Sequence, residues 1–468
     1  MVNQGSRLPS ANRPTSKSRV DAFVGAAILA SLVSVALPAT AAPSAFRKGP
    51  YLQDLSTDSV SIRWELDPPA PATVEITSPN GEIRRFPVTM GAAFASVRVP
   101  GLTPKTAYRY RVVPGEPGAK TLPPDAGVGS VEGAFTTAPP TSETSLRFVV
   151  YGDNRSDDAA HSSVVRAMAK AEGEFLVNTG DLVEDGSNEI DWQHFFEIER
   201  SLLRDRALFA SIGNHELVET GGGSFLRYFG EEVDGGAAPP GDRRRFARSL
   251  RWGSARFLFV NAMDSFATTE ERKWLDAELA RIDQEPGLAF RFVVLHQGPY
   301  SSGPHGPNPR MWNTGLVEAL REHRIDLVFC GHDHLYERGE AKGLKYVVSG
   351  GGGAPLYPVK KRLASSPIAE SAHHFIEVSI KDQSFAMVAR RVDGSVLDRC
   401  GFAKGGGWDC DKPAPKAPEP SQPPIKEPPP ASRCGCDVPG ARSAADALIA
   451  VGLAAIVLVV RRRRARAA

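Results

Sequence analysis

The chain has 468 residues, which is long enough for more than one domain. Its formal net charge of +2 argues against a dedicated nucleic-acid-binding protein. The body of the chain has no basic stretch interleaved with aromatic residues, so we expect no nucleic-acid-binding surface. These properties do not indicate an oligomeric state.

The amino-terminal segment has the pattern of a secretory signal peptide. Basic residues within 13–19 precede an apolar run at 22–37, which ends in the small-x-small cleavage pattern of residues 39–41. We therefore expect residues 1–41 to be removed and the protein to be exported. An uncleaved membrane anchor is the alternative, which the shortness of the apolar run disfavours.

Short alternating strands separated by Pro, Gly and Asn turns characterise residues 45–139. The expected strands lie at residues 60–65, 73–77, 96–99 and 107–113. This pattern, without a convincing helix, predicts a small all-β antiparallel sandwich. Its aromatic residues are typical of a core, so we assign this domain no chemistry.

Residues 145–395 contain five apolar runs, each followed by a short polar motif. The runs lie at 146–150, 175–177, 208–212, 292–295 and 325–330. The motifs are Gly152-Asp153-Asn154-Arg155, Gly180-Asp181, Gly213-Asn214-His215-Glu216, Val294-Leu295-His296 and Gly331-His332-Asp333-His334. Amphipathic stretches predict helices at 159–171, 190–203, 269–282 and 314–323, which makes the region a layered α/β domain. Ligands bind at the carboxyl ends of strands in such domains, so we expect the motifs to form one site.

The order of the five motifs resembles that of the calcineurin-like metallophosphoesterases, and within them the purple acid phosphatases. The resemblance covers about residues 43–391 and implies an α+β four-layered sandwich. Later strands at 345–348, 374–380 and 385–390 fit the second sheet of that sandwich. The preceding domain resembles the fibronectin-III-like domain of purple acid phosphatases, through residues 49–53, 60–64 and 101–110.

Carboxylate, amide and imidazole side chains in these motifs suit a pair of divalent metal ions. Two ions held close together need one ligand that contacts both, and a carboxylate does this best. By the resemblance, Asp181 is this bridge. The other implied ligands are Asp153 and His334 for the first ion, and Asn214, His296 and His332 for the second. We expect manganese, divalent iron or zinc, with a metal-bound hydroxide as the nucleophile.

Three further residues are candidates for contact with the substrate. The resemblance implies that His215 contacts phosphate and protonates the leaving oxygen. His305 and Arg155 are candidate phosphate contacts, and a turn or surface role is the equal alternative for both.

Two positions depart from the family pattern. The tyrosine that purple acid phosphatases place three residues after the bridging aspartate is Glu184 here. The histidine that many relatives place two residues after the first aspartate is Arg155 here. We therefore expect the first ion to lack one protein ligand, with water or Glu184 in its place. We also expect no ferric centre and no purple colour.

The carboxyl-terminal end begins with a linker at residues 411–433, whose many prolines predict an extended stalk. After it come Cys434-Gly435-Cys436, an apolar stretch at 447–460 and four arginines at 461–464. This order resembles the surface-sorting tails of exported myxobacterial proteins. We expect residues 434–468 to be a sorting or transmembrane tail that attaches the protein to the cell envelope.

Cysteines and histidines outside the motifs carry structural expectations. Cys400 and Cys410 bracket a glycine-rich turn in an exported protein, which favours a disulfide. Cys330 is expected to be a small core residue. The histidines expected at the surface, on predicted helices, are His161, His194 and His323.

These features favour an exported phosphohydrolase of the acid-phosphatase type that releases phosphate from monoesters. One alternative is a phosphodiesterase or nucleotide pyrophosphatase of the same family. Another is a catalytically inert surface protein that uses the sandwich and the stalk for adhesion. The intact set of metal-type side chains favours the enzyme. Its substrate depends on loops such as residues 221–241, whose shape the sequence does not reveal.

Overall fold

The computed structural model describes most of residues 45–411. Described are residues 45–89, 91, 93–115, 129–219, 221–230, 246–263 and 270–411. The predicted signal peptide and sorting tail lie outside the described residues, as does the predicted stalk apart from residue 411. Among the described helices, none is both long enough and apolar enough to cross a membrane.

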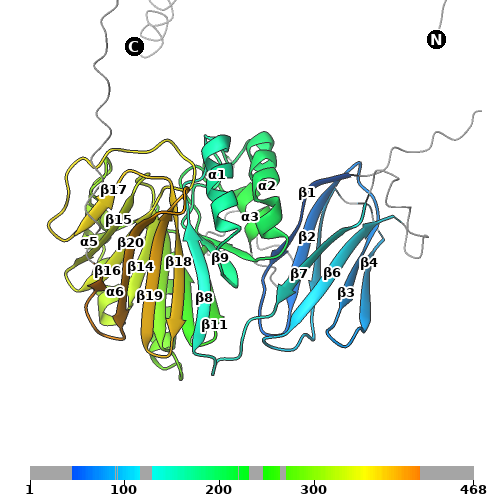
Figure 1. The fold of residues 1–468 in the computed structure, drawn as a ribbon, viewed down its shortest axis with the longest axis horizontal. Helices are drawn as coiled ribbons and strands as arrows, with labels where there is room; N and C mark the ends of the chain where they lie inside the picture. Colours follow the sequence, from blue (N-terminus) through cyan, green and yellow to red (C-terminus); the bar gives the residue numbers. More distant parts are fainter. Residues whose placement is uncertain are drawn as a thin grey trace, which may run out of the picture. The chain divides into compact units, whose positions relative to one another are not determined.

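The strands of residues 45–136 form two antiparallel sheets (Figure 1). One has the order β1-β2-β5, with β1 (Ala45–Gln53), β2 (Val60–Asp67) and β5 (Phe94–Val99). The other has the order β4-β3-β6-β7, with β3 (Ala72–Thr77), β4 (Ile83–Val88), β6 (Ala107–Pro114) and β7 (Val131–Thr136). The aromatic residues Trp64 and Tyr110 are buried in the core. The predicted all-β character is confirmed, and β1, β4 and β7 add to the four expected strands.

Two seven-stranded mixed sheets follow (Figure 1). The first, in the order β10-β9-β8-β18-β19-β20-β21, comprises β8 (Ser145–Tyr151), β9 (Phe175–Asn178), β10 (Leu208–Ala210), β18 (His374–Lys381), β19 (Ser384–Arg391), β20 (Val396–Ala403) and β21 (Asp409–Cys410). The second, in the order β11-β12-β13-β14-β16-β15-β17, comprises β11 (Arg248–Trp252), β12 (Ala255–Phe259), β13 (Phe290–Gln297), β14 (Leu327–Gly331), β15 (Tyr336–Ala341), β16 (Leu344–Ser349) and β17 (Ile368–Glu370). Strands β8 to β10 pair in parallel, and so do β12, β13, β14 and β16. In each parallel group, the loops that follow the strands therefore lie at the same edge of the sheet.

The six described helices cover the outer faces of these sheets. They are α1 (Asp158–Met168), α2 (Glu189–Leu203), α3 (Gly223–Phe229), α4 (Glu270–Asp283), α5 (Pro309–Asn313) and α6 (Leu316–Glu322). In β8, Phe148 packs against Phe257 of the second sheet, with ring centroids 5.0 Å apart, whereas Val149 packs with α1 and α2. In β14, Phe329 faces the core between the sheets, and Cys330 faces the core beneath α4 and α6. The predicted four layers and the core position of Cys330 are confirmed.

The expected grouping of the later strands is wrong in part. β16 lies in the second sheet, but β18 and β19 belong to the first sheet, beside β8. In the antiparallel pairing of β18 with β8, Val378 lies opposite Phe148. An alternating pattern shows which faces of a strand are buried but not which strand lies next to it, so the sequence could not assign this partner.

The helix predictions need two corrections. The helix expected at 314–323 is present as α6, which begins after Gly315, a residue with a left-handed backbone at φ 70°, and the separate helix α5 before it was not predicted. Helix α3 was not predicted. Helices α1 and α2 begin as expected, where the side chains of Asp157 and Asn188 accept main-chain N–H groups.

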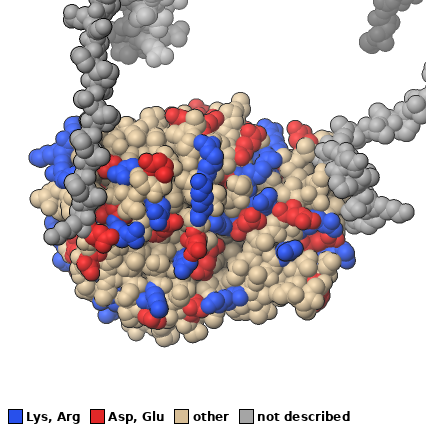
Figure 2. All heavy atoms as spheres, viewed as in Figure 1, with Lys and Arg blue, Asp and Glu red and all other residues tan. Residues whose placement is uncertain are grey.

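The described part of the chain ends in the predicted disulfide. Cys400 and Cys410 are bonded and join β20 to β21, which extend the first sheet past the expected domain end at residue 395. On the face shown in Figure 2, basic and acidic side chains are interspersed and do not gather into a large patch of one sign.

Candidate metal centre

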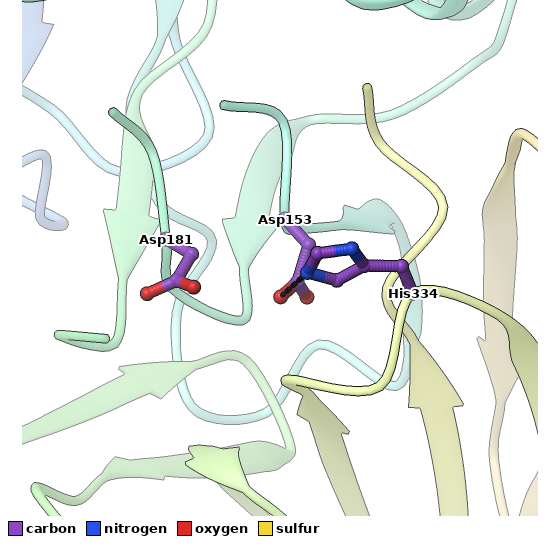
Figure 3. Close-up of side chains that lie close together, drawn as sticks. All are labelled: Asp153, Asp181 and His334. Atoms are coloured by element: carbon purple, nitrogen blue, oxygen red, sulfur yellow. Dashed lines mark ion pairs between the residues drawn. The ribbon is translucent and has the colours of Figure 1, made fainter. Parts of the chain in front are cut away.

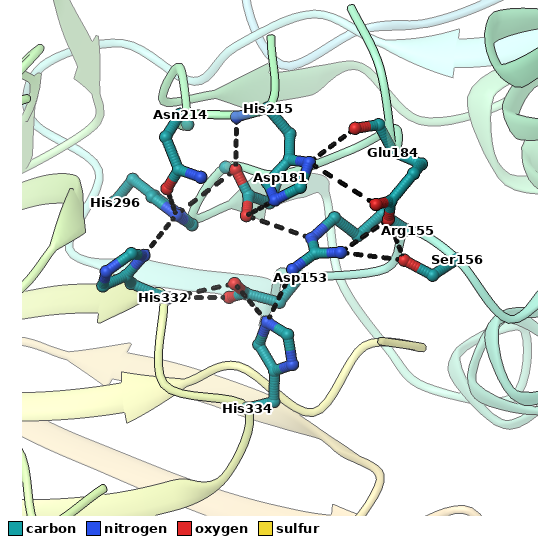
Figure 4. A network of polar contacts seen from close by, with 12 residues as sticks. Asp153, Arg155, Ser156, Asp181, Glu184, Asn214, His215, His296, His332 and His334 are labelled. Atoms are coloured by element: carbon teal, nitrogen blue, oxygen red, sulfur yellow. Dashed lines mark hydrogen bonds and ion pairs between the residues drawn. The ribbon is translucent and has the colours of Figure 1, made fainter. Parts of the chain in front are cut away.

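Five loops at strand ends meet at one place (Figure 4). Asp153 follows β8, Asp181 follows β9 and Asn214 follows β10 in the first sheet. In the second sheet, His296 lies near the end of β13 and His332 follows β14. Because the strands in each group are parallel, these side chains reach the same edge. The structure thus brings together side chains that are far apart in the sequence.

The backbone turns sharply at three of these residues. Asp153, Asp181 and His332 have positive φ angles of 56°, 55° and 70°. Such a conformation costs a residue other than glycine about 1–3 kcal/mol. Hydrogen bonds hold the turns: the N–H of Asp153 donates to the carbonyl of Gly180 at 2.9 Å, and that of His332 donates to the Asp153 carboxylate at 3.0 Å. These turns place the three side chains together in the site (Figure 4).

Glycines in the motifs leave room for the carboxylates. A Cβ atom on Gly213 would lie 2.1 Å from Oδ1 of Asp181. A Cβ atom on Gly331 would lie 2.1 Å from Oδ2 of Asp153. Any side chain at either position would displace a carboxylate, which explains why the motifs contain glycine there.

Three donor atoms surround Nε2 of His296. This nitrogen lies 3.2 Å from Oδ1 of Asn214, and 3.3 Å from both Oδ1 of Asp181 and Nδ1 of His332. Metal–ligand bonds of about 2.0–2.2 Å place neighbouring ligands of one ion about 2.8–3.6 Å apart, depending on whether the coordination is octahedral or tetrahedral. The distances from Nε2 of His296 to the other three atoms are therefore those expected between ligands of one divalent ion, and we call the four atoms the second donor set.

A first donor set consists of Asp153, Asp181 and His334 (Figure 3). Each of the three residues is buried, and one ligand atom from each lies within 4.8 Å of the others. Nε2 of His334 is 3.7 Å from Oδ1 of Asp153. Asp181 is common to both donor sets.

Hydrogen bonds to carbonyl groups orient two of the imidazole rings. Nδ1 of His296 lies 3.0 Å from the carbonyl oxygen of Thr179, and Nδ1 of His334 lies 2.7 Å from that of Pro355. Each Nδ1 donates its hydrogen to the carbonyl, so each Nε2 is turned toward the donor sets. Metal-binding histidines are commonly oriented in this way.

Burial and crowding shift the pKa values of the ligand residues. Burial raises the pKa of Asp153 well above its usual range, while His296 holds the pKa of Asp181 below its usual range against the effect of burial. Burial alone would lower the pKa of His296, but Asp181 and Asp153 raise it to about 9. Burial lowers the pKa of His332 to about 2 and that of His334 to about 4. Nε2 of His296 therefore holds a proton that a divalent ion would replace.

Glu216 ties the ligand loops together, a role that sequence reasoning missed. Its buried carboxylate accepts the N–H of Asp181 at 3.0 Å and those of Leu182 and Gly213 at 2.7 Å. It also accepts the N–H of Val183 at 3.2 Å. The sequence did offer a signal for this role: Glu216 is an acidic residue in a motif that follows a buried strand, and a buried carboxylate needs hydrogen-bond donors.

Glu216→Ala is expected to lower the free energy of unfolding by about 3 kcal/mol or more. The substitution leaves several buried N–H groups without an acceptor, at about 1–3 kcal/mol for each. Urea unfolding followed by circular dichroism measures this effect. Glu197→Ala, at an exposed position of α2, is the matched control. Equal unfolding midpoints for the two variants would show that Glu216 does not support the loops.

His215 lies against the bridge between the donor sets. Its main-chain N–H donates to Oδ1 of Asp181 at 3.1 Å. Its Nδ1 donates to the carbonyl oxygen of Glu184, so Nε2 faces the centre, 3.8 Å from Oδ2 of Asp181. This nitrogen is the only ring atom of His215 left to exchange a proton with a substrate.

Arg155 and His305 lie beside different parts of the centre. Nε of Arg155 donates to Oδ2 of Asp181 at 3.3 Å, and Nη1 is paired with the Glu184 carboxylate. Glu184 also accepts the hydroxyl of Ser156 and is not part of either donor set. His305 is exposed, and its ring centroid lies 4.0 Å from that of His332.

The surface position expected for His161 is wrong. Its side chain is buried, and Nε2 lies 2.9 Å from the buried Oε1 of Glu199. His161 shares a helix face with Val164, Val165 and Met168, a spacing that could have revealed its burial. Of the other two histidines, His194 is about half exposed at 51%, and His323 is 27% exposed.

Comparisons with known proteins give the following similarities. Residues 146–336 match the model of the calcineurin-like phosphoesterase family. An uncharacterized protein of Mycobacterium tuberculosis is 26% identical over 281 residues, which are 51% of this chain and 49% of the relative. A phosphoenolpyruvate phosphatase of Allium cepa is 24% identical over 232 residues, 46% of each chain. The chain thus spans about half the length of these curated relatives.

Among solved structures, the chain is similar to a purple acid phosphatase from yellow lupin (Lupinus luteus) seeds. The TM-score is 0.63 at 17% sequence identity, covering 76% of this chain and 74% of that chain. This similarity establishes the fold.

Proposed function

We propose that this chain, whose residues 146–336 form a calcineurin-like phosphoesterase domain, is a metal-dependent hydrolase of phosphate monoesters. The observation that supports the proposal most is the convergence of two donor sets on Asp181. Asp181 would bridge the two ions, with Asp153 and His334 on one side and three further ligands on the other. Those three are Asn214, His296 and His332.

Two divalent ions, of manganese, iron or zinc, supply positive charge for the phosphate and activate the attacking water when they are bound. The donor chemistry fits such ions, since carboxylate, amide and imidazole groups form a hard-to-borderline set. The spacing around Nε2 of His296 supports the same conclusion for the second donor set.

The residues of the chain contribute binding and proton transfer. His215 holds a proton at Nε2 and gives it to the leaving oxygen, because its Nδ1 is already engaged by Glu184. Arg155 and His305 contact phosphate oxygens from two directions, if the guanidinium turns away from Asp181.

Hydrolysis assays on the full chain test this proposal. We expect p-nitrophenyl phosphate to be cleaved faster than bis(p-nitrophenyl) phosphate, and only when manganese is added after chelation. Preference for the diester would support the alternative of a phosphodiesterase. Bound metal without turnover of any phosphate ester would instead support an inert surface protein.

We further propose that the protein is exported and held at the cell envelope by residues 434–468. Deleting this segment is expected to release active enzyme into the medium, because a proline-rich spacer transmits little structure. Cell fractionation and phosphatase assays of the full-length and truncated forms measure this. Equal retention of both forms on cells would contradict the sorting role, and loss of activity on truncation would place the tail in the fold.

A further inference from the structure

A guanidinium group lies against the first donor set. Nε of Arg155 donates to Oδ2 of Asp181 at 3.3 Å, and Nη2 lies 3.5 Å from Nε2 of His334. Only 12% of the Arg155 side chain is exposed. A largely buried cation thus contacts two of the three residues that would bind the first ion.

The contact with His334 uses the atom that a metal would need. Nδ1 of His334 donates to the carbonyl of Pro355, so Nε2 carries the lone pair. Arginine has N–H donors only, and Nη2 can therefore engage Nε2 only by donating to this lone pair. The guanidinium and a metal ion compete for the same atom of His334.

Further contacts hold Arg155 in this position. Nη1 donates to the hydroxyl of Ser156 at 2.9 Å and is paired with the Glu184 carboxylate. Ser156 also donates to Glu184, so the three side chains form a closed network. An ion that enters the first donor set has to overcome these bonds as well as the positive charge.

In the described part of the chain, the second donor set meets a guanidinium only at Asp181, which it shares with the first set and which Arg155 contacts through Oδ2. Its atoms Oδ1 of Asn214, Nδ1 of His332 and Oδ1 of Asp181 all lie within 3.3 Å of Nε2 of His296. The positive charge in the second donor set is the proton on Nε2 of His296, which leaves when an ion binds, whereas the Arg155 guanidinium cannot lose its charge and has to move. The two donor sets therefore differ in the positive charge that an incoming ion meets.

We propose that Arg155 makes the two metal sites unequal: the second donor set binds a divalent ion tightly, and the first binds one weakly because the ion has to displace the guanidinium. This inference rests on the proposed metal-dependent function. Arg155 would act here as a positioning residue that sets metal occupancy. The enzyme would then be active only at free metal concentrations high enough to occupy the first donor set.

Titration of the chelated full-length protein with Mn²⁺, followed by calorimetry and electron paramagnetic resonance, tests the proposal. For the unchanged chain we expect two sites whose dissociation constants differ by about tenfold or more. Arg155→Met removes the charge and the N–H donors and keeps an unbranched side chain, although a shorter one. It should tighten the weaker site by about tenfold or more and produce the signal of a coupled manganese pair at lower Mn²⁺.

Two further variants separate charge from structure. Arg155→Lys keeps a cation and should keep the weaker site weak, whereas damage to the fold would weaken both sites in both variants. Arg166→Met, at an exposed position of α1, should leave the titration unchanged. Equal affinities in the unchanged chain, or equal changes in the Met and Lys variants of Arg155, would overturn the inference and leave the proposed function standing. Absence of any Mn²⁺ binding would overturn both.

Discussion

Asp181→Asn is expected to abolish metal retention and phosphatase activity together. Asp181 belongs to both donor sets, and its side chain is 2% exposed. The amide keeps the shape of the side chain but removes the negative charge between the two cations. We expect turnover to fall by at least about 10²–10³-fold, the size of effect seen when a key electrostatic group is lost.

Elemental analysis and p-nitrophenyl phosphate turnover measure the two effects of Asp181→Asn. Asp158→Asn is the matched control, because that carboxylate is 63% exposed on α1 and lies outside both donor sets. Circular dichroism shows whether the variants remain folded. If Asp181→Asn still held two metals per chain with near-normal turnover, Asp181 would not be the bridge.

His215→Ala is expected to retain both metals and to lose the protonation of the leaving group. The imidazole donates from Nδ1 to the Glu184 carbonyl and directs Nε2 to the centre, but it belongs to neither donor set. General acid catalysis is typically worth about 10²–10⁴-fold. We expect a loss of that size for an alkyl phosphate, whose leaving group needs the proton, and a much smaller loss for p-nitrophenyl phosphate.

The comparison of the two substrates is the decisive measurement for His215. Metal content should match that of the unchanged chain, and His194→Ala, at a position 51% exposed on α2, should behave normally with both substrates. Equal losses for the alkyl and the p-nitrophenyl ester would contradict the role of general acid and would leave a role in phosphate binding.

The location of the site could be predicted because its chemistry is local. Each buried run is followed at once by polar residues, as with Tyr151 of β8 and Asp153, or Asn178 of β9 and Asp181. In a parallel sheet, the loops at the carboxyl ends of the strands lie close together. We could therefore predict that these side chains meet without knowing any contact between them. The structure shows them together, and their roles as ligands remain predictions until metal is measured.

Partners distant in the sequence could not be predicted in the same way. In the pairing of β18 with β8, Val378 lies opposite Phe148. The pattern of buried and exposed residues in either strand would also have permitted another neighbouring strand. Likewise, His161 carries the helical spacing of a buried residue, but its acceptor Glu199 lies on another helix. The energy of such a strand pairing or side-chain contact depends on the whole sheet or core and not on the local sequence.

The sequence by itself determined which side chains are available for chemistry, where strands and turns place them, and that Arg155 and Glu184 depart from the family pattern. Only the tertiary structure decided that Arg155 lies against Asp181 and His334, and that Glu216 binds the ligand loops. The reason is physical. Residue type and periodicity are local properties, whereas a hydrogen bond or an ion pair requires two groups to meet at about 3 Å, which only the packed chain can arrange.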